Sequence, residues 1–426
     1  MSGGWRTAAF TRERAPWLFA GPVLRLLDVL NADGEEARVV GGAVRNTLLG
    51  LPVSDIDLAT TALPDVVMAR VAAAGLHAVP TGIDYGTITV VINEKGFEVT
   101  TLRQDVETDG RHAVVRFGRD WKADAGRRDF TINAMFVGGD GQVVDFTGGL
   151  EDIEAKRVRF IGDPATRIAE DYLRVLRFFR FHAAYGEGLP DVEGLAACIR
   201  AREQLGQLSR ERVRNELLKL LFALHAVPTL AVMSETGILV DVLAGVPWLS
   251  SFSNMIKAEA QFGFEADATR RLGALAVRVR EDGERLRERL RLTNEETRRL
   301  RSMTERWWQM SPGMSKVERR ATLYRIGPEA YRDRALLAFS RADEKVDNGG
   351  WGELIELPEK WTAPKFPLAA KDFIARGLEK GPALGVAISA AEEAWVLGGF
   401  PSDAASLDAI ADKAAKNTAW ARKQNS

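Results

Sequence analysis

The sequence predicts a mixed α/β domain over residues 1–150, followed by helical modules that continue to residue 426. Two observations support this fold class. Runs rich in Val, Ile and Thr, bounded by Gly or polar turns, recur in the first 150 residues and are typical of strands. Beyond residue 151, apolar residues recur at three- and four-residue spacing, which is typical of helices.

The individual elements follow from these patterns. The expected strands are ARVVGG, SDIDLATT, GTITVVIN, GFEVTTLR, INAMFVGG and QVVDFTGG. The clearest expected helices are TRIAEDYLRVLRFFRFHAAYG and RERVRNELLKLLFALH. Gly and Pro in DNGGWG and PEKWTAPKFP predict a linker before a last helical module at about residues 367–426.

Composition limits the class of protein. With 46% hydrophobic and 27% charged residues, the chain resembles a globular protein with a sizeable core. No run of 18 uncharged apolar residues occurs, and the N-terminus lacks the apolar stretch of a signal peptide, so we expect no membrane association. The single cysteine, Cys198, excludes an internal disulfide. We therefore expect a cytoplasmic protein.

Two aspartates, Asp55 and Asp57, stand one residue apart in LPVSDIDLATT. In an extended segment their side chains point the same way, so two carboxylates converge on one spot. A cation relieves their repulsion, and Mg²⁺ is the natural candidate because it is held by one or two carboxylates plus substrate phosphates. The alternative is an ordinary pair of turn residues in a solvated loop.

A third acid, Glu98, lies among strand formers in GFEVTTLR and could lie beside Asp55 and Asp57. Three carboxylates around two Mg²⁺ ions suit in-line nucleotidyl transfer, in which the ions assist the attacking hydroxyl and the leaving pyrophosphate. An exposed strand residue without catalytic function is the other interpretation.

The segment VVGGAVRNTLLG predicts a strand that ends at Gly41 and Gly42 and a helix that contains Arg45. Paired glycines allow close backbone approach, and Arg45 adds a fork of donors, so this turn is a plausible phosphate cradle. It matches neither a P-loop nor a dinucleotide-binding fingerprint, and a Gly-Gly pair is often only a turn.

Residues 270–306 carry twelve arginines against seven acidic residues on a helical pattern. Because the net charge of the whole chain is −1, contact with nucleic acid requires such a local basic patch. The pattern fits RNA contact and a solvated helix with intrahelical ion pairs equally well.

Together, the Gly-Gly turn, the Asp-x-Asp pair and the strand acid resemble the head of polymerase-β-like nucleotidyltransferases. GRRDFTINAMF (126–136) and RIAEDYLRVLRFFRF (167–181) are similar to signature motifs of class II tRNA CCA-adding enzymes and bacterial poly(A) polymerases. The resemblance covers about residues 38–220. It implies a nucleotidyltransferase head (1–150) followed by an all-α neck (151–225), body (226–350) and tail (351–426), the last of which binds tRNA.

The resemblance also implies roles for individual residues. Asp55 and Asp57 would bind Mg²⁺, with Glu98 as the third catalytic acid. The nucleotide would be bound by Gly41, Gly42, Arg45, Arg128, Asp129, Asn133, Asp171, Arg174, Arg177 and Arg180. The helix in LSRERVRNELLKLL (208–221) would support the pocket.

The chemistry of the last motif also follows from its side chains. Asp171, Arg174, Arg177 and Arg180 recur every third residue on one expected helix. A carboxylate beside a guanidinium offers an acceptor next to donors, which matches the amino group and ring nitrogen of cytosine and adenine but not uracil or guanine. An ion pair on a surface helix is the structural alternative.

Two further segments bear on the function. The polar segment RQDVETDGRHAVVRFGRDWKADA (103–125) corresponds in the family to a flexible loop that helps to switch the pocket from CTP to ATP; alternatively it is an ordinary surface loop. The family usually has Asp where this chain has Asn46, so an acceptor remains but its charge is lost.

The predicted function is addition or repair of the 3′-terminal CCA of tRNA from CTP and ATP, with Mg²⁺ and without a nucleic-acid template. The alternatives are a poly(A) polymerase, which shares every quoted motif, and a non-catalytic RNA-binding protein derived from the same family.

Overall fold

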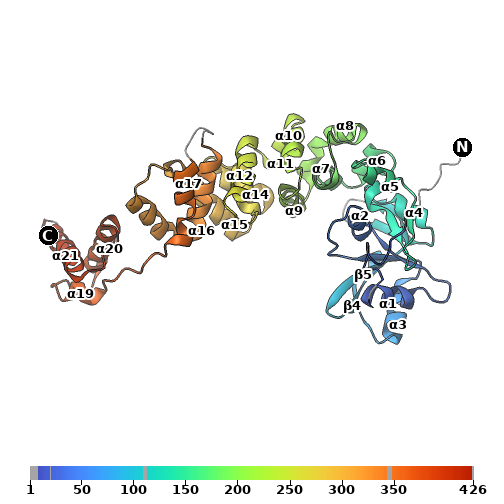
Figure 1. Ribbon diagram of the computed structural model, residues 1–426, viewed down its shortest axis with the longest axis horizontal. Coiled ribbons are helices and arrows are strands. Elements are labelled where there is room, and N and C mark those ends of the chain that lie inside the picture. The colour runs from blue at the N-terminus through green and yellow to red at the C-terminus, as the bar shows by residue number, and fades with distance from the viewer. Residues whose placement is uncertain (1–7, 20, 109–112, 343–347, 425–426) are drawn as a thin grey trace. The chain divides into compact units, whose positions relative to one another are not determined.

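The computed structural model describes residues 8–19, 21–108, 113–342 and 348–424 (Figure 1). The chain divides into two compact units, Met1–Ala244 and Gly245–Ser426. The finer division into head, neck, body and tail remains a prediction. Within the described ranges, no helix is long and apolar enough to cross a membrane.

The first unit is built on a mixed sheet, as the sequence predicts, but the sheet has seven strands where six were expected, and the additional strand is β3 (His77–Gly82). The strand order is β3-β4-β5-β2-β1-β8-β9. Strands β2 and β5 pair in parallel, whereas the other neighbours are antiparallel. The strands are β1 (Ala37–Val40), β2 (Asp57–Thr60), β3 (His77–Gly82), β4 (Thr87–Ile92), β5 (Lys95–Thr101), β8 (Met135–Val137) and β9 (Val143–Asp145).

Helices α1 (Gly21–Leu30) and α3 (Pro64–Ala73) pack against each other and against the sheet (Figure 1). Strand β4 alternates buried and half-buried residues, and Ile88, Val90 and Ile92 join the same apolar core as the two helices. The branched residues whose enrichment predicted this strand are thus the ones that its buried face packs into the core. The apolar core between the sheet and the two helices fixes the sheet, which in turn supports the loops that carry the candidate site.

The segment 103–125 contains regular structure where the sequence suggested a polar loop. Strands β6 (Arg103–Thr108) and β7 (Ala113–Phe117) form an antiparallel hairpin, followed by α4 (Trp121–Gly126). Backbone hydrogen bonds between neighbouring segments stabilise a hairpin even when its composition is polar. The tip, residues 109–112, lies outside the described residues.

The expected single helix over residues 166–186 is instead two helices. α6 (Pro164–Glu170) ends before Asp171, and α7 (Leu173–Tyr185) begins after Tyr172. Asp171 has extended backbone, and its carboxylate accepts the Leu173 N–H at 3.1 Å. Because an Asx side chain competes with the helical hydrogen bond, the break falls at this aspartate.

Among the remaining helices of the first unit, α9 (Arg210–Leu221) and α10 (Ala226–Glu235) pack on α7, whereas α2 (Gly42–Leu48) packs on β1 and β8. The buried face of α9 includes Val213, Leu217 and Leu220. The other helices are α5 (Gly149–Glu154), α8 (Val192–Arg200) and α11 (Ile238–Leu243), with 3₁₀ turns at Ile83–Tyr85, Thr131–Asn133 and Arg202–Gln207.

The described part of the second unit is helical. Its longest helix, α16 (Lys316–Ser340), is kinked at Gly327, which has φ 78° and precedes Pro328. Proline lacks the N–H that the helix requires, so the kink has a local cause. The other helices are α12 (Leu249–Gln261), α13 (Ala268–Ala276), α14 (Arg280–Leu290), α15 (Asn294–Thr304), α17 (Asn348–Ile355), α18 (Leu357–Lys360), α19 (Ala370–Ile374), α20 (Pro382–Leu397) and α21 (Ala404–Gln424), with a 3₁₀ turn at Trp307–Gln309.

Candidate active site

The aspartates Asp55 and Asp57 lie at the start of a central strand. Asp57 is the first residue of β2, and Asp55 lies two residues earlier in the preceding loop. Both line the same pocket. Glu98 of β5 is the register partner of Asp57 across the parallel pair, so the third acid lies beside Asp57 without lining the pocket.

The charge state of Asp57 reflects this crowding. Asp57 is exposed at the pocket wall, but the surrounding protein partly desolvates its carboxylate. This desolvation, and then the charge of Glu98, raise the pKa of Asp57, although Arg128 acts in the opposite direction. A nearby cation stabilises the ionised form of clustered carboxylates whose pKa is raised. The donor set of oxygens therefore fits a hard divalent metal ion.

Among the described residues, no group of three or more His, Cys, Asp or Glu side chains is arranged to hold a metal ion on its own. Two carboxylates that open into a pocket are instead the arrangement in which substrate phosphates and water complete the coordination of Mg²⁺. The site thus fits a metal that binds together with a phosphorylated substrate.

Twelve of the thirteen predicted site residues line one pocket of about 780 Å³ in the first unit. Its wall carries eight arginines and four aspartates, a positive excess that suits a polyphosphate. The volume is within the range of small-ligand sites. The twelve residues are Gly41, Gly42, Arg45, Asp55, Asp57, Arg128, Asp129, Asn133, Asp171, Arg174, Arg177 and Arg180.

Polar side chains in the pocket wall connect α2 and the 3₁₀ turn Thr131–Asn133 to α7. Arg45 donates to the Asn133 carboxamide oxygen, and Asn133 Nδ2 donates to Asp129 Oδ1 at 3.2 Å. Asp129 Oδ2 accepts from Arg177 Nε at 2.7 Å. Burial acts to raise the pKa of Asp129, but Arg177 and the hydrogen bonds lower it overall. The network therefore holds an ionised Asp129 and a fixed Arg177.

The expected base-recognition residues, Asp171 and Arg174, are each held by a partner that the sequence analysis did not select. Asp171 Oδ2 accepts from Arg212 Nη2 at 2.6 Å. Arg174 pairs with Glu170 and donates to the Arg167 carbonyl oxygen at 2.7 Å. Both side chains still line the pocket, with orientations set by these partners.

Glu216 lies on α9, the helix expected to support the pocket, and is a second supporting residue that the sequence motifs did not single out. Its carboxylate pairs with Arg180 and lies 3.9 Å from Arg177 Nη1. Glu216 is only 7% exposed, on the helix face that otherwise carries apolar residues. A charged residue within an apolar stripe of a helix is the sequence signal that could have identified it.

Comparison with known proteins agrees with this geometry. Residues 37–159 match the family described as "Poly A polymerase head domain", and residues 191–249 match "Probable RNA and SrmB- binding site of polymerase A". CCA tRNA nucleotidyltransferase 1, mitochondrial, of Danio rerio is 33% identical over 391 residues, which cover 89% of this chain and 87% of the relative. The chain belongs to the CCA tRNA nucleotidyltransferase family.

Other members of the CCA tRNA nucleotidyltransferase family give the same result. The CCA-adding enzyme of Limosilactobacillus fermentum is 31% identical over 400 residues, covering 90% of this chain and 94% of the relative. The crystal structure of the Bacillus stearothermophilus CCA-adding enzyme in complex with CTP has a TM-score of 0.74 and 26% identity, covering 96% of this chain and 100% of that one. The predicted fold class is therefore confirmed over nearly the whole chain.

Asn46 stands where the resemblance to the family leads us to expect an aspartate. Its carboxamide oxygen accepts from Arg45 Nη2 at 2.9 Å, and its Nδ2 donates to the Pro52 carbonyl oxygen at 2.8 Å. Pro52 belongs to the loop that leads into Asp55. The amide thus connects Arg45 to the aspartate-bearing loop, and an ionised carboxylate could make only the first of these contacts.

Proposed function

We propose that this protein adds or repairs the 3′-terminal CCA of tRNA, using CTP and ATP with Mg²⁺ and no nucleic-acid template. The proposal is supported above all by one pocket that combines the Asp55 and Asp57 carboxylates with the Asp171 and Arg174 pair. It is further supported by membership of the CCA tRNA nucleotidyltransferase family.

In the proposed reaction, the 3′-hydroxyl of the RNA attacks the α-phosphate in line and pyrophosphate leaves. Asp55 and Asp57 would hold Mg²⁺, with Glu98 as the nearby third acid. Bound Mg²⁺ supplies Lewis-acid stabilisation of the attacking and leaving oxygens. The backbone at Gly41 and Gly42, together with pocket arginines such as Arg128, orients the triphosphate and balances its charge.

Selection of cytosine and adenine follows from the side chains of Asp171 and Arg174. The Asp171 carboxylate accepts from the exocyclic amino group of either base, and Arg174 donates to the adjacent ring nitrogen. Uracil and guanine present a carbonyl oxygen to the carboxylate instead. Since a mispaired buried group costs about 1–3 kcal/mol, side chains can reject these bases without a template strand.

Replacing Asp171 with alanine is expected to reduce discrimination against UTP. The repulsion between carboxylate and uracil carbonyl disappears, so the ratio of kcat/KM for CTP to that for UTP should fall about 5- to 150-fold. Single-turnover incorporation on a transcript that ends before CCA measures this ratio. Asp28→Ala, at an exposed position of α1, is the control and should leave the ratio unchanged. An unchanged ratio in Asp171→Ala would exclude Asp171 from base selection.

Replacing Asn46 with aspartate tests the link between Arg45 and the Pro52 loop. The new carboxylate keeps an acceptor for Arg45 but loses the donor to the Pro52 carbonyl, so we expect kcat to fall about tenfold with a smaller change in KM for CTP. Asn46→Ala removes both contacts and should lower kcat further and raise KM. Full activity of Asn46→Asp would show that the Pro52 contact does not position the catalytic loop.

The decisive experiment for the whole proposal is product sizing. Purified protein and Mg²⁺ are incubated with tRNA transcripts that end before CCA, after C and after CC, with CTP and ATP separately and together. Extension that stops at CCA supports the proposal. A long adenylate ladder would instead identify a poly(A) polymerase, and binding of RNA without any incorporation would identify a non-catalytic RNA-binding protein.

The compartment is part of the proposal. We place the activity in the cytoplasm, supported by the free, buried Cys198, the only cysteine of the chain. The Danio rerio relative is named as mitochondrial, which is the competing compartment. Cell fractionation with antibodies against this chain distinguishes the two.

A further inference from the structure

Arg45 differs from most arginines of the pocket in the groups that hold its side chain. Six of the eight arginines in the pocket wall pair with a carboxylate, which cancels much of their charge. Those six are Arg127, Arg128, Arg174, Arg177, Arg180 and Arg212. Arg45 forms no ion pair among the residues that the structure describes, and its hydrogen-bond partners are neutral. Its positive charge therefore stays available to an anionic substrate.

Tyr185, the last residue of α7, holds the Arg45 guanidinium in two ways. The Tyr185 hydroxyl oxygen accepts from Arg45 Nη2 at 2.9 Å, and the centroid of its ring lies 4.1 Å from Arg45 Cζ. Phe181, one turn earlier on α7, adds a second ring, whose centroid is 5.4 Å from the same carbon. The negative face of an aromatic ring attracts a cation. The end of α7 therefore fixes the guanidinium by a hydrogen bond and by cation–π contact.

The other partners of Arg45 complete its orientation. Nε and Nη2 donate to the Asn46 carboxamide oxygen at 3.2 and 2.9 Å, and Nη1 donates to Asn133. Together with the bond to Tyr185, these contacts use every N–H of the guanidinium except one on Nη1. A Cβ atom placed on Gly42 would lie 3.7 Å from Arg45 Nη2, so the guanidinium lies beside the Gly-Gly turn. The remaining N–H is thus held close to the expected phosphate cradle.

Burial makes the charge of Arg45 costly unless an anion is present. Only 7% of Arg45 is exposed, and desolvation lowers the pKa of its guanidinium, although the hydrogen bond with Tyr185 acts in the opposite direction. A buried charge without an opposite charge loses hydration that neutral partners restore only in part. A bound phosphate would supply the missing negative charge, so the site favours an anion next to Arg45.

We propose that Tyr185 is a positioning residue for the triphosphate: it holds the Arg45 guanidinium beside the Gly-Gly turn so that the remaining N–H and the uncompensated charge meet a phosphate group. This inference rests on the proposed function for the identity of the anion. The role is independent of the base, because CTP and ATP carry the same triphosphate. It therefore differs from the role of Asp171 and Arg174.

The test measures nucleotide binding by the full chain without RNA. The probes are analogues of CTP and ATP with a methylene bridge between the α- and β-phosphates, and pyrophosphate, each titrated by calorimetry. Tyr185→Phe removes the hydroxyl and keeps the ring, so we expect Kd for all three probes to rise about five- to tenfold and by the same factor. Tyr185→Leu also removes the cation–π contact and should raise Kd about threefold further. The ratio of kcat/KM for CTP to that for UTP should stay unchanged in both variants.

A double-mutant cycle separates positioning of Arg45 from general support of the end of α7. In the background of Arg45→Met, adding Tyr185→Phe should change Kd by less than about twofold, because the group that Tyr185 orients is gone. Tyr324→Phe is the matched control. It also removes a hydroxyl hydrogen bond, to Glu392 in the second unit, and Tyr324 does not line the pocket. Its Kd values should equal those of the wild-type protein.

Equal Kd values for the wild-type protein and Tyr185→Phe would overturn the inference. So would a loss of the same size in the Arg45→Met background, which would make Tyr185 a structural residue, or a loss confined to one base. The binding assay needs no catalysis. Failure of the wild-type protein to incorporate nucleotide would therefore count against the proposed function, whereas unchanged binding by Tyr185→Phe would count against the role of Tyr185.

Discussion

Replacing Asp57 with asparagine should lower kcat for nucleotide incorporation about a thousandfold, equivalent to about 4 kcal/mol of transition-state stabilisation. Asp57 opens β2 at the pocket, and asparagine keeps its shape while removing the charge that a divalent cation requires. The Mg²⁺ concentration for half-maximal activity should also rise. Rapid-quench incorporation of CMP over a Mg²⁺ titration measures both effects.

The same replacement has a distinct effect on stability. Desolvation and Glu98 raise the pKa of Asp57, so the protonated carboxyl group contributes to the stability of the fold at low pH. This contribution is lost as the pH rises through that pKa. At neutral pH and without a cation, the ionised carboxylate therefore destabilises the fold. We therefore expect the Tm of Asp57→Asn without Mg²⁺ to be unchanged or higher. Asp84→Asn, at an exposed position of the head, should leave activity unchanged. A fall of less than tenfold in kcat for Asp57→Asn would exclude Asp57 as a metal ligand.

Local sequence patterns predicted the parts of the fold that depend on local periodicity. The Val, Ile and Thr content of β4 and the apolar spacing of α7 are each contained in one segment, so no distant contact is needed to recognise these elements. The hairpin of β6 and β7 was missed because its pairing depends on backbone hydrogen bonds that polar residues form equally well. The break at Asp171 was missed because the helical period continues across it.

For the candidate site, too, the sequence pattern identified what is local and missed what depends on distant contacts. Family motifs identified twelve residues of one pocket, since those motifs lie in short contiguous segments. Some of the partners that orient these residues lie far away in the chain: Arg212, which holds Asp171, is 41 residues away. The arginines of 270–306 fitted an RNA surface and an ion-paired helix equally well, because helical spacing is the same for both. Only the fold separates the buried Arg270 from the exposed Arg298.

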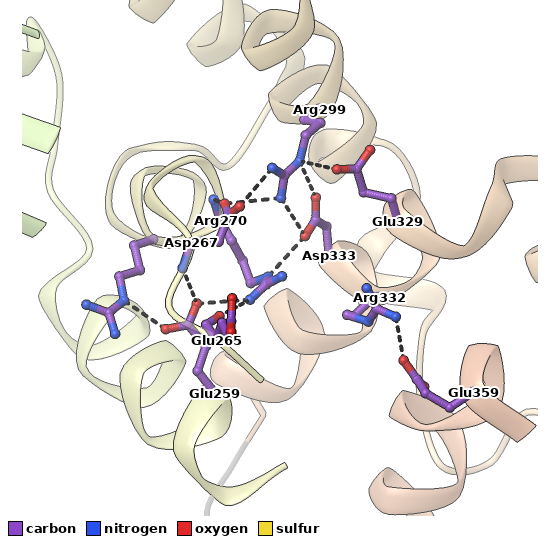
Figure 2. Close-up of polar contacts among 10 residues, drawn as sticks. Glu259, Glu265, Asp267, Arg270, Arg299, Glu329, Arg332, Asp333 and Glu359 are labelled. Carbon is purple, nitrogen blue, oxygen red and sulfur yellow. Dashed lines mark hydrogen bonds and ion pairs between the residues drawn. The ribbon is translucent and has the colours of Figure 1, made fainter. Parts of the chain in front are cut away.

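The buried ion-pair network in Figure 2 predicts the largest effect on stability. Asp333, on α16, is 1% exposed and accepts from Arg270 Nε at 3.0 Å and Arg299 Nε at 2.9 Å. Burial opposes the charge of Arg299, but its hydrogen bonds with Asp333 and Asp267 raise the pKa of Arg299. Removing the carboxylate with Asp333→Ala leaves two guanidinium groups undercompensated in the core. We expect a loss of about 3–5 kcal/mol in the free energy of unfolding of this unit.

Hydrogen exchange of amides in α13, α15 and α16 of the full chain measures this loss locally, which matters because a chain of two units need not unfold in one step. Glu329 provides a matched control one turn earlier on α16, since it lies 3.5 Å from Arg299 but is 57% exposed. Glu329→Ala should therefore cost less than about 1 kcal/mol. Asp333→Asn keeps the acceptor oxygen without its charge. Its loss of unfolding free energy should therefore lie between those of Asp333→Ala and Glu329→Ala. Equal effects of Asp333→Ala and Glu329→Ala would show that burial does not amplify this ion pair.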